Sequence, residues 1–279
     1  MDMSSIIENM VSRAAAATPV QDGDFLQDGL LHCGKCRTPK QCRVEFGGKL
    51  YTPSCLCRCE TERIAEEQRE KAREEQERKV QRMRRLAFPD LTMQAWNFQR
   101  DDGTDQRTTG VMKRYVEHFD ELRRSGKGLL LYGPVGTGKT FAACEVANAL
   151  IDRGIPCYVT NFARLSNTIQ RLFDDRQGYI DSLSRYDLLV IDDLGAERKS
   201  EYMQEIVWTI IDARYRSGKP MIITTNLSMD EIKNPANINY SRIYDRIIER
   251  CFPLEVAGKS RRRAAVRADY DATKALLGL

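Results

Sequence analysis

The segment GPVGTGKT has the residue types and the spacing of a loop that binds nucleotide phosphates. The pattern G-x-x-x-x-G-K-[ST] runs from Gly133 to Thr140, and Gly136 adds a flexible position inside it. Glycines let backbone N–H groups turn toward an anion, the Lys139 ammonium reaches the β and γ phosphates, and the Thr140 hydroxyl is a ligand for Mg²⁺. An apolar run before the loop and a helix-forming run after it favour this interpretation over a structural glycine-rich turn. The predicted phosphate-binding residues are Gly133, Pro134, Val135, Gly136, Thr137, Gly138, Lys139, Thr140 and Phe141.

Two later apolar stretches end in polar groups that suit the same chemistry. LLVIDDLGAE ends in two aspartates, and carboxylates at the carboxyl end of a parallel strand stand where ligands bind in open α/β sheets. We expect Asp192 to hold Mg²⁺ together with Thr140, and Asp193 to orient or deprotonate the attacking water. MIITTNLS ends at Asn226, whose amide is suited to sensing the γ-phosphate. Taken alone, the aspartates could cap a helix and Asn226 could form a turn.

Four cysteines near the amino terminus have the spacing of a structural metal site. Cys33 and Cys36 form a C-x-x-C pair, and Cys57 and Cys59 provide a second pair. Four thiolates bind Zn²⁺ tetrahedrally and leave no position open for catalysis, so a structural zinc ion is predicted. The other candidate ligands are Cys55, which is the next choice, and the expected bystanders Cys42 and His32.

Composition and length limit the class of protein. A chain of 279 residues is long enough for one large and one small domain. Its 44 Lys and Arg against 40 Asp and Glu give a formal charge of +4, which is too small for nucleic-acid binding over the whole surface. No run approaches about 18 apolar residues, and the amino terminus lacks the pattern of a signal peptide, so a cytoplasmic protein is predicted. Residues 30–60 contain too little apolar material for a core, so metal is expected to supply much of the folding free energy there.

The elements that must position these groups follow from periodicity. Residues 60–85 contain neither Gly nor Pro and alternate in charge, which predicts a solvated connecting helix, with a partner-binding helix as the alternative. A strand or aromatic tuck with a turn is expected over residues 95–105, and a helix over 110–124. Apolar runs then alternate with helical stretches, which indicates a parallel sheet covered on both faces. The predicted strands are 128–132, 156–160, 187–192, 220–225 and 253–256, and the predicted helices are 139–152, 162–173, 201–217 and 239–250.

In their order, the motifs GPVGTGKT, LLVIDDLGAE, MIITTNLS, SRIYDRIIERC and AGKSRRR resemble those of the AAA+ ATPases of the DnaC/DnaI helicase-loader group, relatives of the IstB transposition helper. The resemblance covers roughly residues 85–270, and the cysteine cluster is similar to that of Gram-positive and phage members. It implies an α/β AAA+ P-loop ATPase with a parallel sheet flanked by helices, joined to a small amino-terminal zinc-binding domain. Because few residues follow AGKSRRR, the helical lid of most AAA+ proteins is expected to be absent or minimal.

The resemblance also implies roles for individual residues. Asn226 matches the first sensor, and Arg246 matches the arginine finger that reaches the nucleotide of a neighbouring subunit. Arg262 matches the second sensor, which contacts the nucleotide, with Arg261 as the alternative. Asp193 lies within the family pattern, in which the second acidic position is Asp or Glu.

The implied organisation is a zinc-binding, helicase-docking domain over residues 1–60, a helical linker over 61–87 and an AAA+ domain over 88–279. The implied function is that of an ATPase, slow until stimulated by DNA or partner, which loads a DnaB-type hexameric helicase onto single-stranded DNA at replication initiation. ATP, Mg²⁺ and Zn²⁺ are the expected cofactors, and self-association, as a hexamer on the helicase, is expected. The alternatives are an IstB-like transposition helper and a zinc-bearing adaptor that uses ATP as a switch.

A segment between the second and third predicted strands mixes arginines with aromatic residues. This composition suits a surface that follows a phosphate backbone and stacks on bases, and in the resembling loaders this region contains an inserted helix that faces a central channel. The alternative is that the phenylalanines belong to the core and the arginines to a solvated face. The residues concerned are Phe162, Arg164, Arg171, Phe173, Arg176, Tyr179, Arg185 and Tyr186.

Overall fold

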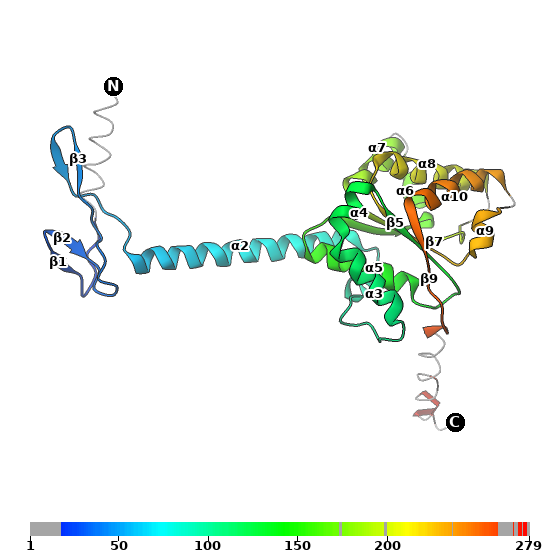
Figure 1. The fold of residues 1–279 in the computed structure, drawn as a ribbon, viewed down its shortest axis with the longest axis horizontal. Coiled ribbons are helices and arrows are strands. Elements are labelled where there is room, and N and C mark those ends of the chain that lie inside the picture. The colour runs from blue at the N-terminus through cyan, green and yellow to red at the C-terminus, as the bar shows by residue number, and fades with distance from the viewer. Residues whose placement is uncertain are drawn as a thin grey trace. The chain divides into compact units, whose positions relative to one another are not determined.

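The structure is a computed structural model that describes residues 18–172, 175–197, 200–235 and 237–261, together with five residues near the carboxyl terminus. The chain divides into two compact units, Met1–Glu77 and Arg78–Leu279, and the boundary lies within helix α2 (Arg58–Ala87) (Figure 1). The predicted second sensor Arg262 and the predicted aromatic residue Phe173 lie outside the described residues.

The amino-terminal unit contains two short antiparallel hairpins. Strand β1 (Phe25–Gln27) pairs with β2 (Leu30–His32), and β3 (Val44–Phe46) pairs with β4 (Lys49–Tyr51). Their turns contain Asp-Gly and Gly-Gly, the dipeptides that favour tight hairpins. Sequence periodicity did not predict these strands, because three residues are too few for an alternating pattern to stand out.

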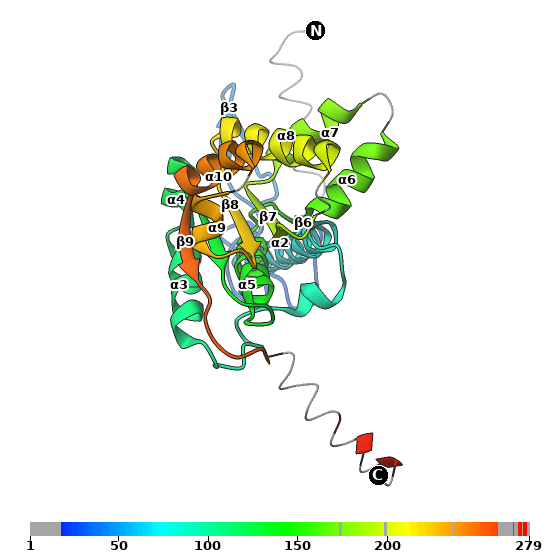
Figure 2. The same ribbon diagram turned by 90° about the vertical axis from the view of Figure 1, so that its right-hand side faces the viewer.

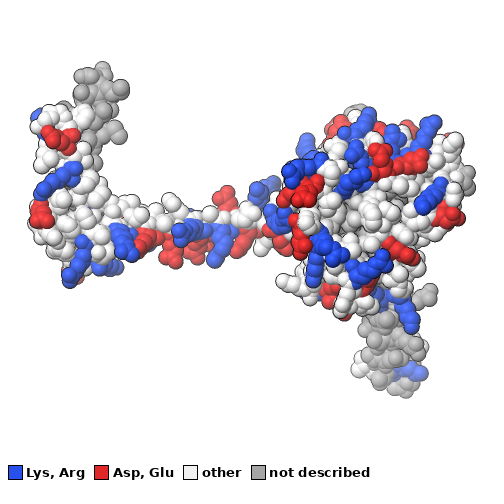
Figure 3. Space-filling view, viewed as in Figure 1, with Lys and Arg blue, Asp and Glu red and all other residues white. Residues whose placement is uncertain are grey.

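Helix α2 covers the predicted charged helix of residues 60–85 and extends it slightly at both ends. Its charges pair along its own surface, as in Arg58–Glu62 at 2.9 Å, and Figure 3 shows both signs interspersed along it. Such exposed pairs contribute little stability. Only its last turns pack against the core of the second unit, through Val80, Met83 and Ala87.

The second unit is built on a five-stranded parallel sheet with strand order β6-β7-β8-β5-β9. Figure 2 labels four of these strands, β6 to β9. The strands of the sheet lie within one or two residues of the predicted ones, so the predicted parallel sheet is confirmed. They are β5 (Gly128–Tyr132), β6 (Cys157–Asn161), β7 (Leu188–Leu194), β8 (Met221–Thr225) and β9 (Cys251–Glu255).

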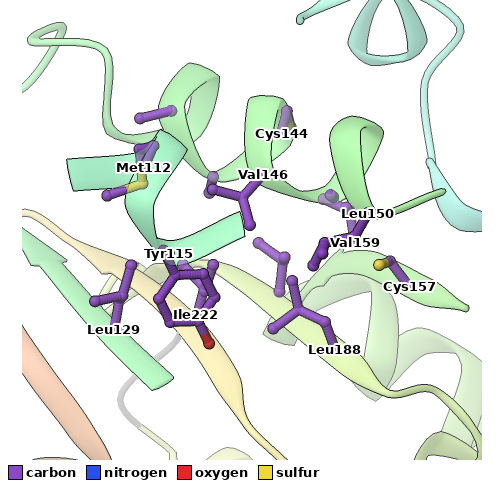
Figure 4. Close-up of a cluster of buried hydrophobic side chains, with 14 of the residues drawn as sticks. Met112, Tyr115, Leu129, Cys144, Val146, Leu150, Cys157, Val159, Leu188 and Ile222 are labelled. Carbon is purple, nitrogen blue, oxygen red and sulfur yellow. The ribbon is translucent and has the colours of Figure 1, made fainter. Parts of the chain in front are cut away.

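Helices cover both faces of this sheet and separate two apolar clusters. On one face, side chains of α3 and α5 pack on the strands, with Tyr115, Val146 and Leu150 among the buried residues (Figure 4). On the other face, the cluster is formed by α6 to α10. The helices of the first face are α3 (Gln106–Glu117), α4 (Phe119–Ser125) and α5 (Lys139–Asp152). Those of the second are α6 (Phe162–Arg171), α7 (Arg176–Ser182), α8 (Glu201–Ser217), α9 (Met229–Lys233) and α10 (Ile238–Arg250).

The order of strands creates a crevice at the carboxyl end of β5. Strands β5 and β8 are neighbours, but α5 leaves β5 toward one face of the sheet, whereas α9 and α10 follow β8 on the other face. Ligands bind at such a topological switch point in open α/β sheets. The loop after β5, the end of β7 and the end of β8 therefore meet at one edge.

Two stretches differ from the sequence-based prediction. The helix expected over residues 110–124 is two helices, because the chain departs from helical geometry at His118 (φ −94°, ψ 15°) and so turns Phe119 into the core. Residues 95–105, which were expected to form a strand or an aromatic tuck, contain no strand. A short 3₁₀ turn, η1 (Thr92–Ala95), leads into this stretch, and Trp96 is half-buried.

Candidate nucleotide site and metal centre

The phosphate loop joins β5 to α5 with the geometry that its glycines allow. Gly133, Gly136 and Gly138 all have positive φ, at 140°, 84° and 103°. A Cβ on Gly133 would lie 2.6 Å from the backbone oxygen of Val256, so no larger residue fits there. Helix α5 begins at Lys139, and its free N–H groups and positive dipole end point toward the loop.

Lys139 and Asn226 lie together in this crevice. The Lys139 side chain is buried and donates hydrogen bonds from Nζ to the carbonyl oxygens of Gly133 (2.8 Å) and Pro134 (2.7 Å) and to Oδ1 of Asn226 (2.8 Å). The ammonium group is thus fixed between the loop and the end of β8. Both residues are suited to contact the same terminal phosphate.

The carboxylate of Asp192 is positioned by two threonines from different elements. Thr140, the first residue after Lys139 in α5, donates to Oδ1 at 2.8 Å, and Thr224 of β8 donates to the same atom at 2.5 Å. Two donors on one oxygen fix the orientation of this carboxylate, which is suited to act on Mg²⁺ or its water. The structure brings together the two predicted magnesium ligands, Thr140 and Asp192.

Asp193 occupies a strained position beside them. Its φ of 56° is in the left-handed region, and the register between β7 and β8 shifts between Ile191 and Leu194, which indicates a bulge. Its backbone N–H donates to the hydroxyl of Thr224 at 3.0 Å. Thr224 is completely buried and links both aspartates. Its role could not be predicted from the sequence, because a threonine within an apolar strand has an ordinary structural role.

A cavity of about 260 Å³ lies against these residues. Trp96 and Phe141 form part of its wall, with ring centroids 5.8 Å apart, and provide an aromatic surface suited to a flat base. Three of the wall residues come from the segment predicted only to be a strand or aromatic tuck with a turn, and they are Trp96, Arg100 and Asp102. The cavity is also lined by predicted residues, namely Val135, Gly136, Gly138, Lys139, Thr140, Phe141, Asp193 and Asn226.

Arg261 crosses the mouth of the phosphate loop. Its backbone N–H donates to the carbonyl of Gly136 at 2.9 Å, and its side chain would lie 3.2 Å from a Cβ on Gly138. The guanidinium pairs with Asp102 at 3.1 Å and with Asp101 at 3.5 Å. Arg261 was the alternative to Arg262 as second sensor, and it lines the cavity.

Glu145 is a buried carboxylate on α5. Its Oε1 has no hydrogen-bond partner among the described residues. Burial raises the pKa of Glu145 to about 8, and Asp101 adds to this shift, whereas Arg261 and Lys113 oppose it. The raised pKa favours the protonated, uncharged form of Glu145 near neutral pH.

Arg246 does not line this cavity. Its guanidinium pairs with Asp212 at 2.8 Å and stacks over the ring of Trp208 at 3.9 Å. Arg242, one turn earlier on α10, is exposed and makes no ion pair within the described part of the chain. Both arginines therefore belong to a surface of α8 and α10 outside the cavity.

The segment predicted to contact DNA separates into a buried and an exposed part. Phe162 belongs to the core, and Tyr186 stacks on Tyr158 with centroids 5.0 Å apart. Tyr179 is half-buried, and burial raises its pKa to about 12. The arginines are exposed, so charge, more than aromatic stacking, is what this surface presents to solvent. These arginines are Arg164, Arg171, Arg176 and Arg185.

In the amino-terminal unit, the structure gathers the four cysteines that the spacing predicted. The sulfur atoms of Cys33, Cys36, Cys57 and Cys59 all lie within 4.8 Å of one another. The distances from the Cys59 sulfur are 3.6 Å to Cys33 and 3.4 Å to Cys57. Four sulfurs at about 2.3 Å from a zinc ion would lie roughly 3.8 Å apart in a tetrahedron, so this donor set fits a metal ion.

The electrostatics of the cluster also favour a cation. The hydroxyl of Thr38 lowers the pKa of Cys36 to about 5, and backbone N–H groups of Cys36 and Lys35 lower the pKa of Cys33. Hydrogen bonds that the Cys59 thiol donates to the neighbouring sulfurs raise the pKa of Cys59 to about 12. Four thiols this close cannot all ionise without a positive charge between them, and a divalent ion provides it.

An ion pair holds the knuckle that presents the first two thiols. Asp24 accepts from Lys40 Nζ at 2.6 Å and from the backbone N–H of Gly34, within the C-x-x-C, at 3.0 Å. Hydrogen bonds from Lys40 and backbone groups lower the pKa of Asp24 to about 2. Because Asp24 stays ionised far below neutral pH, this support persists under conditions that protonate thiolates.

The other candidate ligands lie apart from the cluster. His32 donates from Nδ1 to the carbonyl of Leu30 at 3.1 Å and stacks on Phe25. Cys42 is exposed and Cys55 is half-buried, and neither belongs to the group of four.

A family model described as IstB-like ATP binding protein matches residues 61–268. The chain belongs to this family. The match to the IstB-like family covers most of α2 and nearly all of the second unit. None of the helices in the described residues is long and apolar enough to cross a membrane.

Several relatives found by sequence comparison are named as replicative helicase loaders. The chain is 27% identical over 205 residues to the replicative helicase loader DnaI of Bacillus subtilis, covering 67% of this chain and 65% of DnaI. It is 30% identical over 139 residues to the replicative helicase loader DnaC of Escherichia coli, covering 48% and 54%. The chain thus spans between half and two thirds of the length of these relatives.

A solved structure supports the fold of the second unit. The crystal structure of a protein described as a primosome component of Streptococcus pyogenes serotype M3 aligns with 63% of this chain and 93% of its own length. The TM-score is 0.53 at 20% sequence identity, which shows a shared fold. The predicted AAA+ P-loop fold, with an amino-terminal cysteine cluster that could hold zinc, is confirmed at this level.

The four-thiol cluster leads to a prediction about the metal content of the protein and the folding of its amino-terminal unit. Protein purified without added metal should contain about one zinc ion per chain, measured by elemental analysis. Replacing Cys33 and Cys36 by Ser should remove the metal and unfold the amino-terminal unit, while ATP binding is retained because the second unit has its own core. Acid should release the metal from the wild type, because protons compete for the thiolates. Metal bound at full stoichiometry after both substitutions would contradict this assignment.

Proposed function

We propose that this protein is an ATP-dependent loader of a DnaB-type hexameric helicase onto single-stranded DNA during replication initiation. The observation that carries the proposal is the convergence of Lys139, Thr140, Asp192, Asp193 and Asn226 at one edge of the sheet in a family member whose relatives are named replicative helicase loaders. The proposed place of action is the cytoplasm.

ATP is the proposed ligand of the cavity, and hydrolysis is the proposed reaction. Lys139 would neutralise the β and γ phosphates, Thr140 and Asp192 would hold Mg²⁺, and Asn226 would report the γ-phosphate. Mg²⁺ would neutralise charge that develops on the phosphates. Asp193, fixed by its backbone hydrogen bond to Thr224, would orient or deprotonate the attacking water. Arg261 would exchange its aspartate partners for phosphate oxygens, with Arg262 as the other candidate.

The amino-terminal unit favours the loader over the IstB-like alternative. The family model begins at residue 61, after the four cysteines, so the general IstB-like ATPase region does not include the metal centre. We assign this unit, within the proposed domain of residues 1–60, to docking on the helicase. An IstB-like transposition helper would instead assemble on duplex DNA. A zinc-bearing adaptor would bind ATP without turnover.

Self-association, as a hexamer on the helicase, would complete the proposed site. Arg246 is the proposed finger that reaches the nucleotide of the next subunit, for which it would leave Asp212 and Trp208. Arg242 is the second candidate on the same helix, because it is exposed and makes no ion pair within the described part of the chain. Arg171 and its neighbours are the proposed contacts to single-stranded DNA.

The loading proposal predicts a specific biochemical outcome. The chain should capture the native DnaB-type helicase, and the complex should separate DNA strands on a template coated with single-strand-binding protein. The Lys139→Ala protein should capture the helicase but should not load it onto DNA when ATP is added, because it lacks the ammonium group that acts on the transferred phosphate. Equal loading by Lys139→Ala, or assembly on duplex DNA with a transposase, would contradict the proposal.

Replacing Arg171 and Tyr179 by Ala should weaken single-strand binding without changing ATP affinity.

Action across subunits predicts complementation. Arg246→Ala chains mixed with Lys139→Ala chains should regain part of the ATPase activity, because some interfaces then combine an intact loop with an intact arginine. Arg242→Ala chains mixed in the same way are the matched comparison. Recovery confined to the Arg242→Ala mixture would move the role to that residue. No recovery in either mixture of co-assembled chains would overturn action in trans.

A further inference from the structure

A buried amide on α5 holds the turn that carries Trp96. The Asn148 side chain is on a residue only 1% exposed, and its Nδ2 donates to the carbonyl of Met93 at 3.1 Å and to the carbonyl of Trp96 at 2.8 Å. The N–H of Trp96 closes this turn by donating to the carbonyl of Met93 at 3.2 Å. One amide group therefore binds both ends of the turn from which the Trp96 ring projects.

The oxygen of the same amide is held by α2. Nε of Arg84, in the last turn of α2, donates to Oδ1 of Asn148 at 3.1 Å. The Arg84 guanidinium also pairs with Asp152, one turn after Asn148 on α5. Because a guanidinium only donates and a carbonyl only accepts, these partners determine which end of the amide is the oxygen. Residues 78–87 of α2 belong to the second unit, so the whole network lies within one compact unit.

This network leads to the aromatic wall of the nucleotide cavity. Phe141 and Asn148 are seven residues apart on α5, which is about two turns, so they lie on the same face of that helix. Trp96 packs beside Phe141 with ring centroids 5.8 Å apart, and both residues line the cavity. Phe141 is fixed by the first turn of α5, whereas Trp96 lies outside any helix or strand. The place of Trp96 in the wall therefore depends on the hydrogen bonds of Asn148 and on the packing of its own ring.

We propose that Asn148 is a positioning residue for the base of the bound nucleotide, which it serves by holding Trp96 beside Phe141, and that Arg84 orients Asn148. A ring that is already in place stabilises a bound base more than one that must be ordered on binding. The phosphates are held by the loop and by Lys139, which this network does not contact. The inference rests on the proposed function, because it takes ATP as the ligand of the cavity.

A purely structural role for Asn148 makes a different prediction. The neighbouring buried residues on α5 are apolar, including Ala147, Leu150 and Ile151, and a buried amide among them could serve only to satisfy the carbonyls of the turn. Loss of such a group would lower the stability of the unit and affect every ligand of the cavity equally. A positioning role instead requires that only the base-dependent part of binding is lost.

The test compares the affinities of the full-length protein for ATP and for inorganic tripolyphosphate, both with Mg²⁺, because tripolyphosphate has the phosphates and lacks the base. Asn148→Asp keeps the shape of the side chain and an acceptor for Arg84, but replaces both donors by an oxygen that faces carbonyls. In calorimetric titration we expect Asn148→Asp to bind ATP roughly 10-fold more weakly than wild type, the effect of losing about one hydrogen bond, and to bind tripolyphosphate as wild type does. Trp96→Ala should show the same selective loss, and the double variant should lose little more, because Asn148 acts through Trp96.

Two partly exposed residues provide matched variants that leave the buried amide in place. Arg84→Met removes the donor to Asn148 and keeps an apolar stem, whereas Asp152→Asn removes only the ion pair of Arg84. Arg84→Met should weaken ATP binding selectively, by less than Asn148→Asp does. Asp152→Asn should bind both ligands like wild type.

Trp96 also reports its own position by fluorescence. With Trp208→Phe it is the only tryptophan of the chain, and saturating ATP should quench its emission strongly when Asn148 is present and weakly after Asn148→Asp. Equal losses of affinity for ATP and tripolyphosphate, additive losses in the double variant, or quenching that Asn148→Asp leaves unchanged would overturn the inference alone. Failure of the wild type to bind ATP would overturn the proposed function together with it.

Discussion

The interaction on which the rest of the nucleotide site depends is the pair of hydrogen bonds to one oxygen of Asp192. Thr140 and Thr224 reach this oxygen from α5 and from β8, so a single carboxylate joins the phosphate loop, the acidic strand and the strand that ends at Asn226. Each element is fixed by its own apolar core, but the polar atoms meet only because the strand order makes β7 and β5 the two neighbours of β8. The polar groups that meet at this crevice are available to a ligand that can neutralise their charges, which a nucleotide with Mg²⁺ does.

The amino-terminal unit is stabilised in a different way. It buries few apolar side chains, and its structure rests on two short hairpins, the Asp24–Lys40 ion pair and the four-thiol cluster. A unit of this size gains folding free energy from a metal ion that it cannot gain from a core. We therefore expect the two units to respond to different perturbations: removal of metal should affect the first, and substitutions in the phosphate loop should affect the second.

Local sequence determined the elements of the second unit well because its strands and helices have strong periodicity and clear ends. Residues whose role depends on their own motif, such as Lys139, Asp192 and Cys33, were predicted for the same reason. Thr224, Trp96 and the contacts of Arg261 were not, because their roles arise only when segments distant in sequence meet. The break at His118 is a tertiary effect, since burial of Phe119 outweighs the local preference for one continuous helix. Arg246 matched a motif, yet its contacts with Asp212 and Trp208 could be found only in three dimensions.

The most direct test of this account measures how much Mg²⁺ strengthens ATP binding when the support of Asp192 is removed. Thr224→Val deletes the hydroxyl that binds Asp192 at nearly constant volume, and Thr225→Val is the matched control, since the Thr225 hydroxyl binds the carbonyl of Leu194 instead. Calorimetric titration should show that Thr224→Val loses roughly 10- to 100-fold of the Mg²⁺-dependent gain in ATP affinity, which is the usual effect of losing a group that positions a metal ligand. The Thr225→Val protein should keep this gain. An equal Mg²⁺-dependent gain in the two variants would contradict the account.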